Sequence, residues 1–485
     1  MLRPVSPRVC CKFRRPNRLP YLARFTVSSL SSSELFSKPA TLELPNAPSV
    51  AYAAVTHPLP GPAPSSKTRE TIALAKDYIL PVYARLPIVL DRGQGSWVWD
   101  CDGRKYLDFS AGIAVNALGH ADEGVSEMLK SQSSKLMHTS NLYYNEPSAA
   151  LASLLVTLTQ REGGLGYPAG DHHPTGVPGA KVFFCNSGTE ANEGALKVAR
   201  KVGKDRGGPT KTEIVCFQQS FHGRSFGALS VTSTRKYQDP FMPLVPGVRV
   251  GVLNQSEGLE DLITENTCAV IVEPIQGEGG VNSADIEWMR KLVQRARDTG
   301  AVVIFDEIQC GLYRTGTLWA HSAWPVDCHP DIVTMAKPLA NGYPIGAVLM
   351  RDAVMGTMTT GSHGTTFGGS PLACSLGFHV LDRLSQREFV SHLNRTSAFL
   401  LRRLERLSGW FPDLVGPIRG CGLIIGLVLI REGDAQRLVE LARERGVLLL
   451  TAGTDCVRLV PSLNVSEEEV SHAVDVIESC LGLLS

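Results

Sequence analysis

The sequence predicts an α/β protein with a mostly parallel sheet and helices on both faces. Short apolar runs recur from residue 181 onward without the alternation of a half-exposed sheet. Helical stretches lie between some of these runs, as in βαβ units. Polar residues follow several runs directly, where ligands bind in such sheets. The predicted strands are 181–185, 213–217, 269–273, 301–305, 331–335 and 347–350, and the helices between them include 191–202 and 286–298.

The remaining chain is expected to add a smaller α+β domain. Residues 95–112 alternate, turn at Asp102-Gly103 and alternate again, which predicts a hairpin. A helix is predicted at 149–158 and a long loop at 163–180. From residue 382 the pattern predicts a helix near 385–408, a strand at 423–430, a helix at 434–445, short strands and a final helix from Ser466. We therefore predict an N-terminal segment at 67–110 that joins the small domain, a large domain at 111–381 and a small domain at 382–485.

The N-terminal region differs in composition from the rest of the chain. Residues 1–33 contain seven Lys/Arg and no acid, and serines gather near their end. This composition is typical of a mitochondrial transit peptide, so we expect cleavage and a location in the mitochondrial matrix. Its four prolines leave a disordered basic tail as the alternative. Residues 34–66, which are poor in charge and rich in Pro and Ala, are expected to be a disordered linker.

Composition excludes several kinds of protein. The 485 residues are 43% hydrophobic and 20% charged, which suits a large folded core. The net charge of +1 gives no reason to expect nucleic acid as a partner. No apolar run reaches the roughly 18–20 residues that span a bilayer. The twelve cysteines show no CxxC or Cys/His spacing, so buried thiols are favoured over disulfides or zinc. His172-His173 lack ligand partners nearby and are interpreted as part of a solvated loop.

Asp306 and Lys337 each follow a predicted buried strand. An ionised carboxylate in that place is costly unless it is paired, and a protonated pyridine nitrogen is a suitable partner. Gln309, three residues further on, can donate to a ring hydroxyl. A desolvated lysine has a lowered pKa and can act as nucleophile and base, although a surface lysine is the alternative. Together an acid and an amine can hold a cofactor that needs both. For Glu307 we derive no role.

Two further motifs also follow predicted strands. Ser187, Gly188 and Thr189 open a helix and can bind a phosphate through main-chain N–H groups and hydroxyls. The alternative is a simple capping box made by Ser187 and Glu190. In residues 220–227, Phe221 can stack on a ring and Arg224 can bind a carboxylate with two hydrogen bonds. The alternative there is a core phenylalanine and a surface arginine.

Three glycine-rich turns carry candidate substrate contacts. Glu278 lies in the turn that follows Glu273, where it can contact a substrate or pair with an arginine. Thr365 and Thr366 lie in a loop of small residues and can bond anionic oxygens. Arg419 lies among glycines, so a second carboxylate can approach it. Each of these signals is weak alone.

The order of the motifs is more specific than any one of them. The chain contains SGTEAN, FHGR, EPIQGEGG, FDEIQCG, AKPLANGYPIGA, HGTTFGG and RGCGLIIG in succession. This set resembles the class III aminotransferases, which are pyridoxal 5'-phosphate enzymes of fold type I. The resemblance covers about residues 68–485.

The resemblance implies roles for individual positions. Lys337 is expected to hold the cofactor through a Schiff base, and Asp306 to bind its pyridine nitrogen. The other expected cofactor contacts are Ser187, Gly188, Thr189, Phe221, Gln309 and, from the other subunit of a homodimer, Thr366. The expected substrate contacts are Arg224, Thr365 and Arg419. Arg419 is expected to take the α-carboxylate of glutamate, with Glu278 as its switchable partner.

The resemblance also implies a reaction. Stretches 110–120, 138–152 and 362–374 are most similar to family members that transfer the terminal amino group of N2-acetyl-L-ornithine to 2-oxoglutarate, a step of arginine biosynthesis. Ornithine, 4-aminobutyrate and succinylornithine remain open as donors. An aminomutase or decarboxylase on the same fold is a further alternative, and a non-catalytic binding protein is a third.

Overall fold

A computed structural model describes residues 63–170 and 179–484, which all belong to one compact unit of the chain. The predicted transit peptide, most of the predicted linker and His172-His173 lie outside the described residues. No helix among the described residues is long and apolar enough to cross a membrane. The proposed division into domains at residues 111 and 382 stays a prediction.

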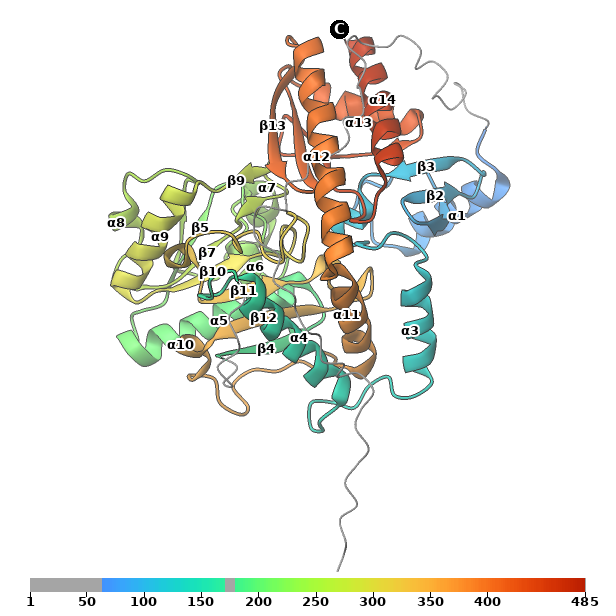
Figure 1. Cartoon of the computed structure of the whole chain (residues 1–485). Helices are drawn as coiled ribbons and strands as arrows, with labels where there is room; N and C mark the ends of the chain where they lie inside the picture. The colour runs from blue at the N-terminus through green and yellow to red at the C-terminus, as the bar shows by residue number, and fades with distance from the viewer. Residues whose placement is uncertain (1–62, 171–178, 485) are drawn as a thin grey trace, which may run out of the picture. The chain divides into compact units, whose positions relative to one another are not determined.

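A seven-stranded sheet forms the centre of the fold (Figure 1). Its order is β4-β12-β11-β10-β7-β5-β6, and only β12 runs antiparallel to its neighbours. The prediction of a mostly parallel sheet is therefore confirmed. The short edge strand β6, which includes Arg249, was not predicted. The strands are β4 (Ala180–Cys185), β5 (Glu213–Phe217), β6 (Val248–Gly251), β7 (Thr267–Val272), β10 (Val302–Asp306), β11 (Ile332–Met335) and β12 (Gly346–Arg351).

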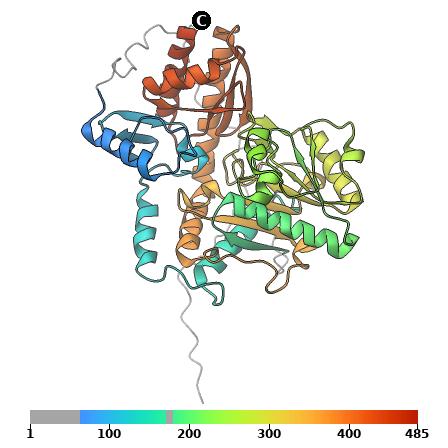
Figure 2. The same cartoon turned by 180° about the vertical axis from the view of Figure 1, so that it is seen from behind.

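Helices pack against both faces of this sheet. Helix α5 (Gly188–Gly207) contributes alanines and valines to the core on one face, and Figure 2 shows this long helix crossing the strands. Helix α9 (Ile286–Thr299) covers the other face with one apolar stripe, which includes Trp288 and Leu292. Its first turn is capped by Asp285, whose carboxylate accepts from the main chain of Trp288 at 2.9 Å. Smaller helices in the same region are α6 (Phe226–Ser230), α7 (Arg235–Gln238), α8 (Leu259–Leu262) and α10 (Asp352–Met355).

The N-terminal part of the described chain forms a second sheet. The predicted hairpin is confirmed as β2 (Trp97–Asp100) and β3 (Lys105–Asp108), and β1 (Leu90–Gln94) extends it. The fourth strand is β15 (Val447–Leu448), which pairs with β3 in parallel from near the other end of the chain. Helices in this part are α1 (Ser66–Tyr78), α2 (Ala111–Ala114), α3 (Glu123–Ser133) and α4 (Glu146–Glu162).

The C-terminal part has helices on an antiparallel sheet of order β13-β14-β17-β16. The predicted strand at 423–430 is β14 (Ile424–Leu429), but it pairs with β13 (Val415–Cys421), a Gly- and Pro-containing strand that was not predicted. The long helix α12 packs against α14 (Figure 1). The remaining elements are α11 (Pro371–Leu384), α12 (Arg387–Trp410), α13 (Asp434–Glu444), β16 (Leu450–Ala452), β17 (Cys456–Leu459) and α14 (Glu467–Leu484).

Candidate active site

Asp306 is the last residue of β10 and is almost fully buried. Its Oδ2 accepts from the Nδ2 of Asn192 at 2.7 Å and lies 2.8 Å from the Nδ1 of His222. Within the described residues, its Oδ1 accepts a single hydrogen bond, from the main-chain N–H of Ile308 at 3.0 Å. Hydrogen bonds to the ionised form offset the cost of burying the carboxylate. Oδ1 therefore keeps an open acceptor position for a further donor.

Lys337 lies two residues beyond β11, the strand that pairs with β10. It is half-buried and has no hydrogen-bond partner among the described residues. Burial lowers the pKa of its amine to about 8, and the nearby charge of Arg458 adds to this, while Asp306 opposes it. The structure thus brings the predicted acid and amine together at the ends of adjacent strands. A lysine with a lowered pKa is a usable nucleophile and base.

An arginine that the sequence reading missed stands beside these two groups. Arg458 lies in β17 and is 2% exposed. Its guanidinium donates to the Oε1 of Gln309 at 3.0 Å and to Glu278 at 3.1 Å. With its oxygen occupied in this way, Gln309 keeps its amide N–H groups for another acceptor. A Cβ at Gly277 would stand 2.1 Å from the Gln309 oxygen, so a larger residue here would displace the Gln309 side chain.

The expected pairing of Glu278 with Arg419 is corrected by this geometry. Arg419 lies in β13 and donates instead to the main-chain oxygen of Gly280 at 3.1 Å and to Asn282 at 3.3 Å. Its acidic neighbour is Asp455, at 3.4 Å. Arg458 lies on β17 and Arg419 on β13, the two strands that flank β14.

The predicted phosphate cradle is the first turn of α5. The Oγ of Ser187 accepts from the N–H of Glu190 at 3.3 Å, so this serine does cap the helix. The N–H groups of Gly188 and Thr189 have no acceptor among the described residues. The hydroxyl of Thr189 lies 2.7 Å from that of Ser225. Free N–H groups at the start of a long helix suit an anion.

The loop after β5 holds Phe221 and Arg224 through its main chain. Glu273 accepts from the N–H of Phe221 at 3.0 Å, and Thr232 accepts from the N–H of His222 at 2.8 Å. Burial raises the pKa of Glu273 well above its usual value, and the charge of Asp306 adds to the effect. Arg224 is exposed, and its guanidinium carbon lies 3.8 Å from the ring centroid of Tyr237.

Thr365 and Thr366 differ in their surroundings. The hydroxyl of Thr365 accepts from the Nδ2 of Asn186 at 3.1 Å, directly before the phosphate cradle. Thr366 is exposed and has no partner among the described residues. The structure therefore places Thr365 near the cradle of its own chain and leaves Thr366 available to another molecule.

Three site residues escaped the sequence reading: Arg458, His222 and Asn192. Arg458 had a usable signal, because a cation inside the apolar run 456–460 must be buried and needs a partner. His222 stands between two noted residues, and its role depends on a contact with Asp306 that only the fold creates. Its Nε2 has no partner among the described residues. Asn192 is buried in α5 and accepts from Thr334 of β11 at 2.8 Å.

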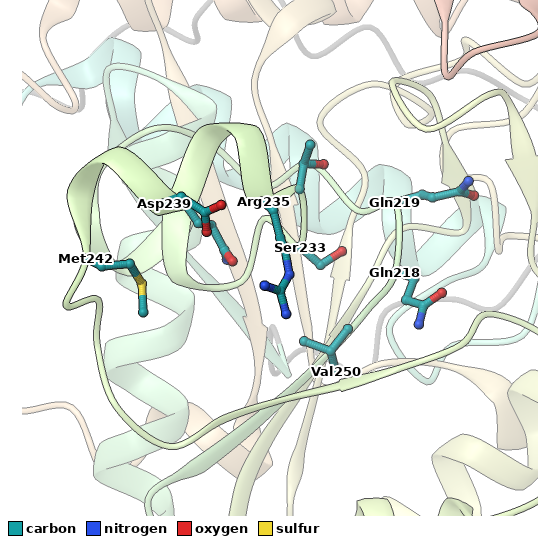
Figure 3. Close-up of a pocket in the computed structure, with 9 residues that line it drawn as sticks. Gln218, Gln219, Ser233, Arg235, Asp239, Met242 and Val250 are labelled. Atoms are coloured by element: carbon teal, nitrogen blue, oxygen red, sulfur yellow. The ribbon is translucent and has the colours of Figure 1, made fainter.

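A cavity of about 640 Å³ is lined by residues other than the site residues described above. It is lined from the ends of β5 and β6 and from α7, and Arg235 extends into it (Figure 3). Gln219 lies at one side, and its Oε1 accepts from Asn282 at 3.1 Å. Neither Lys337 nor Asp306 is among the residues that line the cavity.

Comparison with known proteins gives consistent matches. The family model described as "Aminotransferase class-III" matches residues 79–481. The mitochondrial acetylornithine aminotransferase of Neurospora crassa is 48% identical over 87% of this chain and 89% of its own length. A succinylornithine transaminase from Citrobacter koseri is 42% identical over 84% of this chain and 96% of its own. The crystal structure of an ornithine aminotransferase from Toxoplasma gondii matches with a TM-score of 0.77 and 30% identity, over 86% of this chain and 95% of its own.

Proposed function

The chain belongs to the class III aminotransferases, and from that premise we propose that it transfers the terminal amino group of N2-acetyl-L-ornithine to 2-oxoglutarate. The products are N-acetyl-L-glutamate 5-semialdehyde and L-glutamate. The observation that carries the reaction class is Lys337, a half-buried amine beside the strand that ends at Asp306, with no hydrogen-bond partner in the part of the chain that the structure describes. The choice of donor is supported by the Neurospora relative, which is more similar to this chain than the succinylornithine or ornithine enzymes named above.

Pyridoxal 5'-phosphate is the cofactor, and the described residues fit it. The open acceptor position on Asp306 suits a protonated pyridine nitrogen, and the free amide of Gln309 suits the ring oxygen. The unbonded N–H groups of Gly188 and Thr189 suit the phosphate. Lys337 supplies the amine for covalent attachment. Glu273 holds the main chain of Phe221, whose side chain is proposed to stack on the ring.

Bound pyridoxal phosphate supplies an electron sink for the pair of electrons left when the amine-bearing carbon loses its proton. Lys337 removes that proton and returns it, and its lowered pKa keeps part of the amine neutral near physiological pH. Asp306 keeps the ring nitrogen protonated through its charge. Asn192 and His222 hold the carboxylate in place at Oδ2.

Arg224 and Arg458 are proposed to bind different carboxylates in the two half-reactions. Acetylornithine carries its carboxylate far from the reacting amine, and 2-oxoglutarate carries one carboxylate far from its keto group and one beside it. We assign the distal carboxylate in both cases to the exposed Arg224 and to Thr365. The adjacent carboxylate of 2-oxoglutarate is assigned to Arg458, and Glu278 pairs with Arg458 when that carboxylate is absent. Arg419 is thereby left with a supporting role near Gly280.

We also propose a homodimer with shared active sites. Exposed apolar side chains, including Leu142, Tyr143 and Tyr144, gather in a segment that Asn141 ties to the loop of Thr365, through a bond of 3.1 Å to its main-chain oxygen. An exposed apolar patch of this kind is typical of an interface. The patch adjoins Thr366, which would then reach the phosphate of the partner's cofactor.

A mitochondrial location is supported from two sides. The Neurospora relative is named as mitochondrial, and residues 1–33 have the composition of a transit peptide. Fusing these residues to a fluorescent protein tests the proposal. Import into mitochondria is expected, and a cytosolic signal would contradict it.

The donor is tested with a panel of amines and 2-oxoglutarate, following glutamate formation. The panel contains acetylornithine, ornithine, 4-aminobutyrate and succinylornithine. We expect the highest kcat/KM with acetylornithine, and a clear preference for unacetylated ornithine would overturn the proposal. Lys337→Ala is the control that is expected to lose both the absorbance of the bound cofactor and turnover.

A further inference from the structure

Arg224 follows a main chain that is held by hydrogen bonds, but its own side chain makes no hydrogen bond or ion pair among the described residues. The N–H of Gly223 bonds to the hydroxyl of Thr232 at 3.2 Å, and that hydroxyl donates back to the oxygen of Gly223 at 3.1 Å. Gly223 has a φ of 134° and lies so close to Thr189 that a Cβ would stand 2.3 Å from its hydroxyl. The guanidinium of Arg224, in contrast, has no hydrogen bond and no ion pair among the described residues.

The aromatic ring of Tyr237 is what holds this guanidinium. The central carbon of the Arg224 guanidinium lies 3.8 Å from the ring centroid of Tyr237 and 5.5 Å from that of Phe221. The two rings meet edge to face, with centroids 6.3 Å apart. An arginine at these distances from aromatic rings is attracted by their faces. A guanidinium that packs flat against a ring keeps its in-plane N–H groups free to bind a carboxylate.

The ring of Tyr237 is itself fixed in place. Tyr237 lies in α7, and its N–H bonds to the main-chain oxygen of Thr234 at 2.9 Å. The next residue, Gln238, donates to the main-chain oxygens of Leu229 and Ser230 at 3.0 and 3.2 Å, which anchors α7 to α6. The hydroxyl of Tyr237 has no partner among the described residues, so the ring face is its only observed means of holding Arg224.

We propose that Tyr237 is a positioning residue for substrate binding: its ring orients Arg224 so that a carboxylate far from the reacting carbon meets a guanidinium already in place. The proposal rests on the role of Arg224 under the proposed function. An arginine side chain without such support would have to be ordered at the moment of binding, at a cost in entropy. Because both acetylornithine and 2-oxoglutarate carry a distal carboxylate, Tyr237 acts on both half-reactions.

Three variants test this, each in the enzyme loaded with cofactor. Tyr237→Leu removes the ring, Tyr237→Phe keeps the ring without the hydroxyl, and Arg235→Ala is the control in the same helix. Arg235 lines the cavity described above (Figure 3), and no hydrogen bond joins it to Arg224 or Tyr237 among the described side chains. The measurements are KM and kcat for both substrates, the dissociation constant of glutarate as a probe with two carboxylates, and the absorbance of the bound cofactor.

We expect Tyr237→Leu to raise both KM values and the glutarate dissociation constant by about 3- to 30-fold, the range of a cation–π contact, with kcat nearly unchanged. Tyr237→Phe is expected to restore most of the binding, and Arg235→Ala to behave as the wild type. The proposal is overturned if Tyr237→Leu binds as tightly as the wild type, or if Tyr237→Phe is as weak as Tyr237→Leu. It is also overturned if Tyr237→Leu loses cofactor absorbance in proportion to kcat.

This test remains decisive if the donor has been misidentified. The effects on 2-oxoglutarate and glutarate do not depend on which amine the enzyme prefers, whereas the donor panel depends only on the amine. Weak glutarate binding in Tyr237→Leu together with a preference for ornithine would uphold the role of Tyr237 and reject the proposed donor.

Discussion

At the scale of single residues, two arginines near Glu278 have different surroundings. Arg458 is buried and bonds to both Gln309 and Glu278, while Arg419 is half-buried and bonds to Gly280 and Asn282. An arginine whose acidic partner is partly exposed can exchange that partner for a substrate carboxylate. Glu278 is 40% exposed at its side chain, which suits such an exchange.

Arg458→Met is therefore expected to raise the KM for 2-oxoglutarate on the order of 10- to 100-fold, as for the loss of a hydrogen bond between charged groups. The KM for acetylornithine should change much less, because acetylornithine has no carboxylate beside its reacting amine. Steady-state kinetics with each substrate varied in turn measures both values. Arg419→Met is the matched variant, and a larger effect there than at Arg458 would return the role to Arg419.

The lowered pKa of Lys337 has a consequence for stability. In the cofactor-free protein, the folded state disfavours the charged amine, whose pKa is about 8 when folded and 10.5 when unfolded. Below pH 8 the amine is charged in both states, so folding bears the full cost of burying that charge. Between pH 8 and 10.5 the unfolded state binds more protons, so stability rises with pH.

Lys337→Met should consequently stabilise the cofactor-free protein at pH 7, by up to about 3 kcal/mol. The gain should disappear as pH rises from about 8 to 10.5. Urea unfolding at several pH values measures it, and Lys291→Met, at an exposed lysine of α9, is the control. A variant that is less stable than the wild type at pH 7 would show that the buried charge is compensated in the apo protein.

At the scale of elements, the segment that follows β10 is held by Glu307. This residue is fully buried, and its carboxylate accepts from the N–H of Ala320 at 2.8 Å and lies 2.6 Å from the Nδ1 of His321. The other ring nitrogen of His321 accepts from the N–H of Leu165 at 3.2 Å. Glu307, which had no derivable role, thus fixes the loop that connects Asp306 to the rest of the sheet.

Glu307→Ala is expected to destabilise the cofactor-free protein by about 3 kcal/mol or more, because it leaves buried donors without an acceptor. Thermal and urea unfolding measure the loss. Glu257→Ala, at an exposed glutamate without a partner among the described residues, should change stability by less than about 0.5 kcal/mol. Equal stability of Glu307→Ala and the wild type would mean that the loop is held by other contacts.

The elements also show which features the sequence could predict. Strands β7, β10 and β11 are buried on both faces, so each appears in the sequence as an uninterrupted apolar run that predicts a strand. Strand β6 was missed because it is a short edge strand that contains Arg249, and β13 was missed because it contains glycines and a proline. Within the site, Asp306 and Lys337 could be predicted because each lies at or just beyond the end of such a strand. Glu278 and Arg458 are 180 residues apart in the sequence, and only the tertiary fold brings them together. No local sequence pattern therefore predicts this pairing.

At the scale of the whole molecule, the proposed homodimer makes each active site depend on two chains. Lys337 would come from one subunit and Thr366 from the other, because Thr366 is exposed and bonds to nothing in the described chain. Two variants that are each inactive can then complement one another. Lys337→Ala removes the amine, and Thr366→Glu places a negative charge against the phosphate.

An equal mixture of the two variants, unfolded and refolded together, is expected to recover about a quarter of the wild-type sites, because half of the dimers are mixed and each has one intact site. Glutamate formation by the mixture measures the recovery, and each variant refolded alone is the control. Activity that stays at the level of the separate variants would mean that Thr366 serves its own subunit.

The parallel pairing of β3 with β15 joins segments from near opposite ends of the chain. A ribosome delivers β3 early, but the strand that completes its sheet emerges only when nearly the whole protein has been made. Until then one edge of β3 stays open to pairing with other chains. The open edge of β3 is therefore expected to need protection by chaperones during synthesis and after translocation, and C-terminal truncations before Val447 would remove the strand that covers this edge.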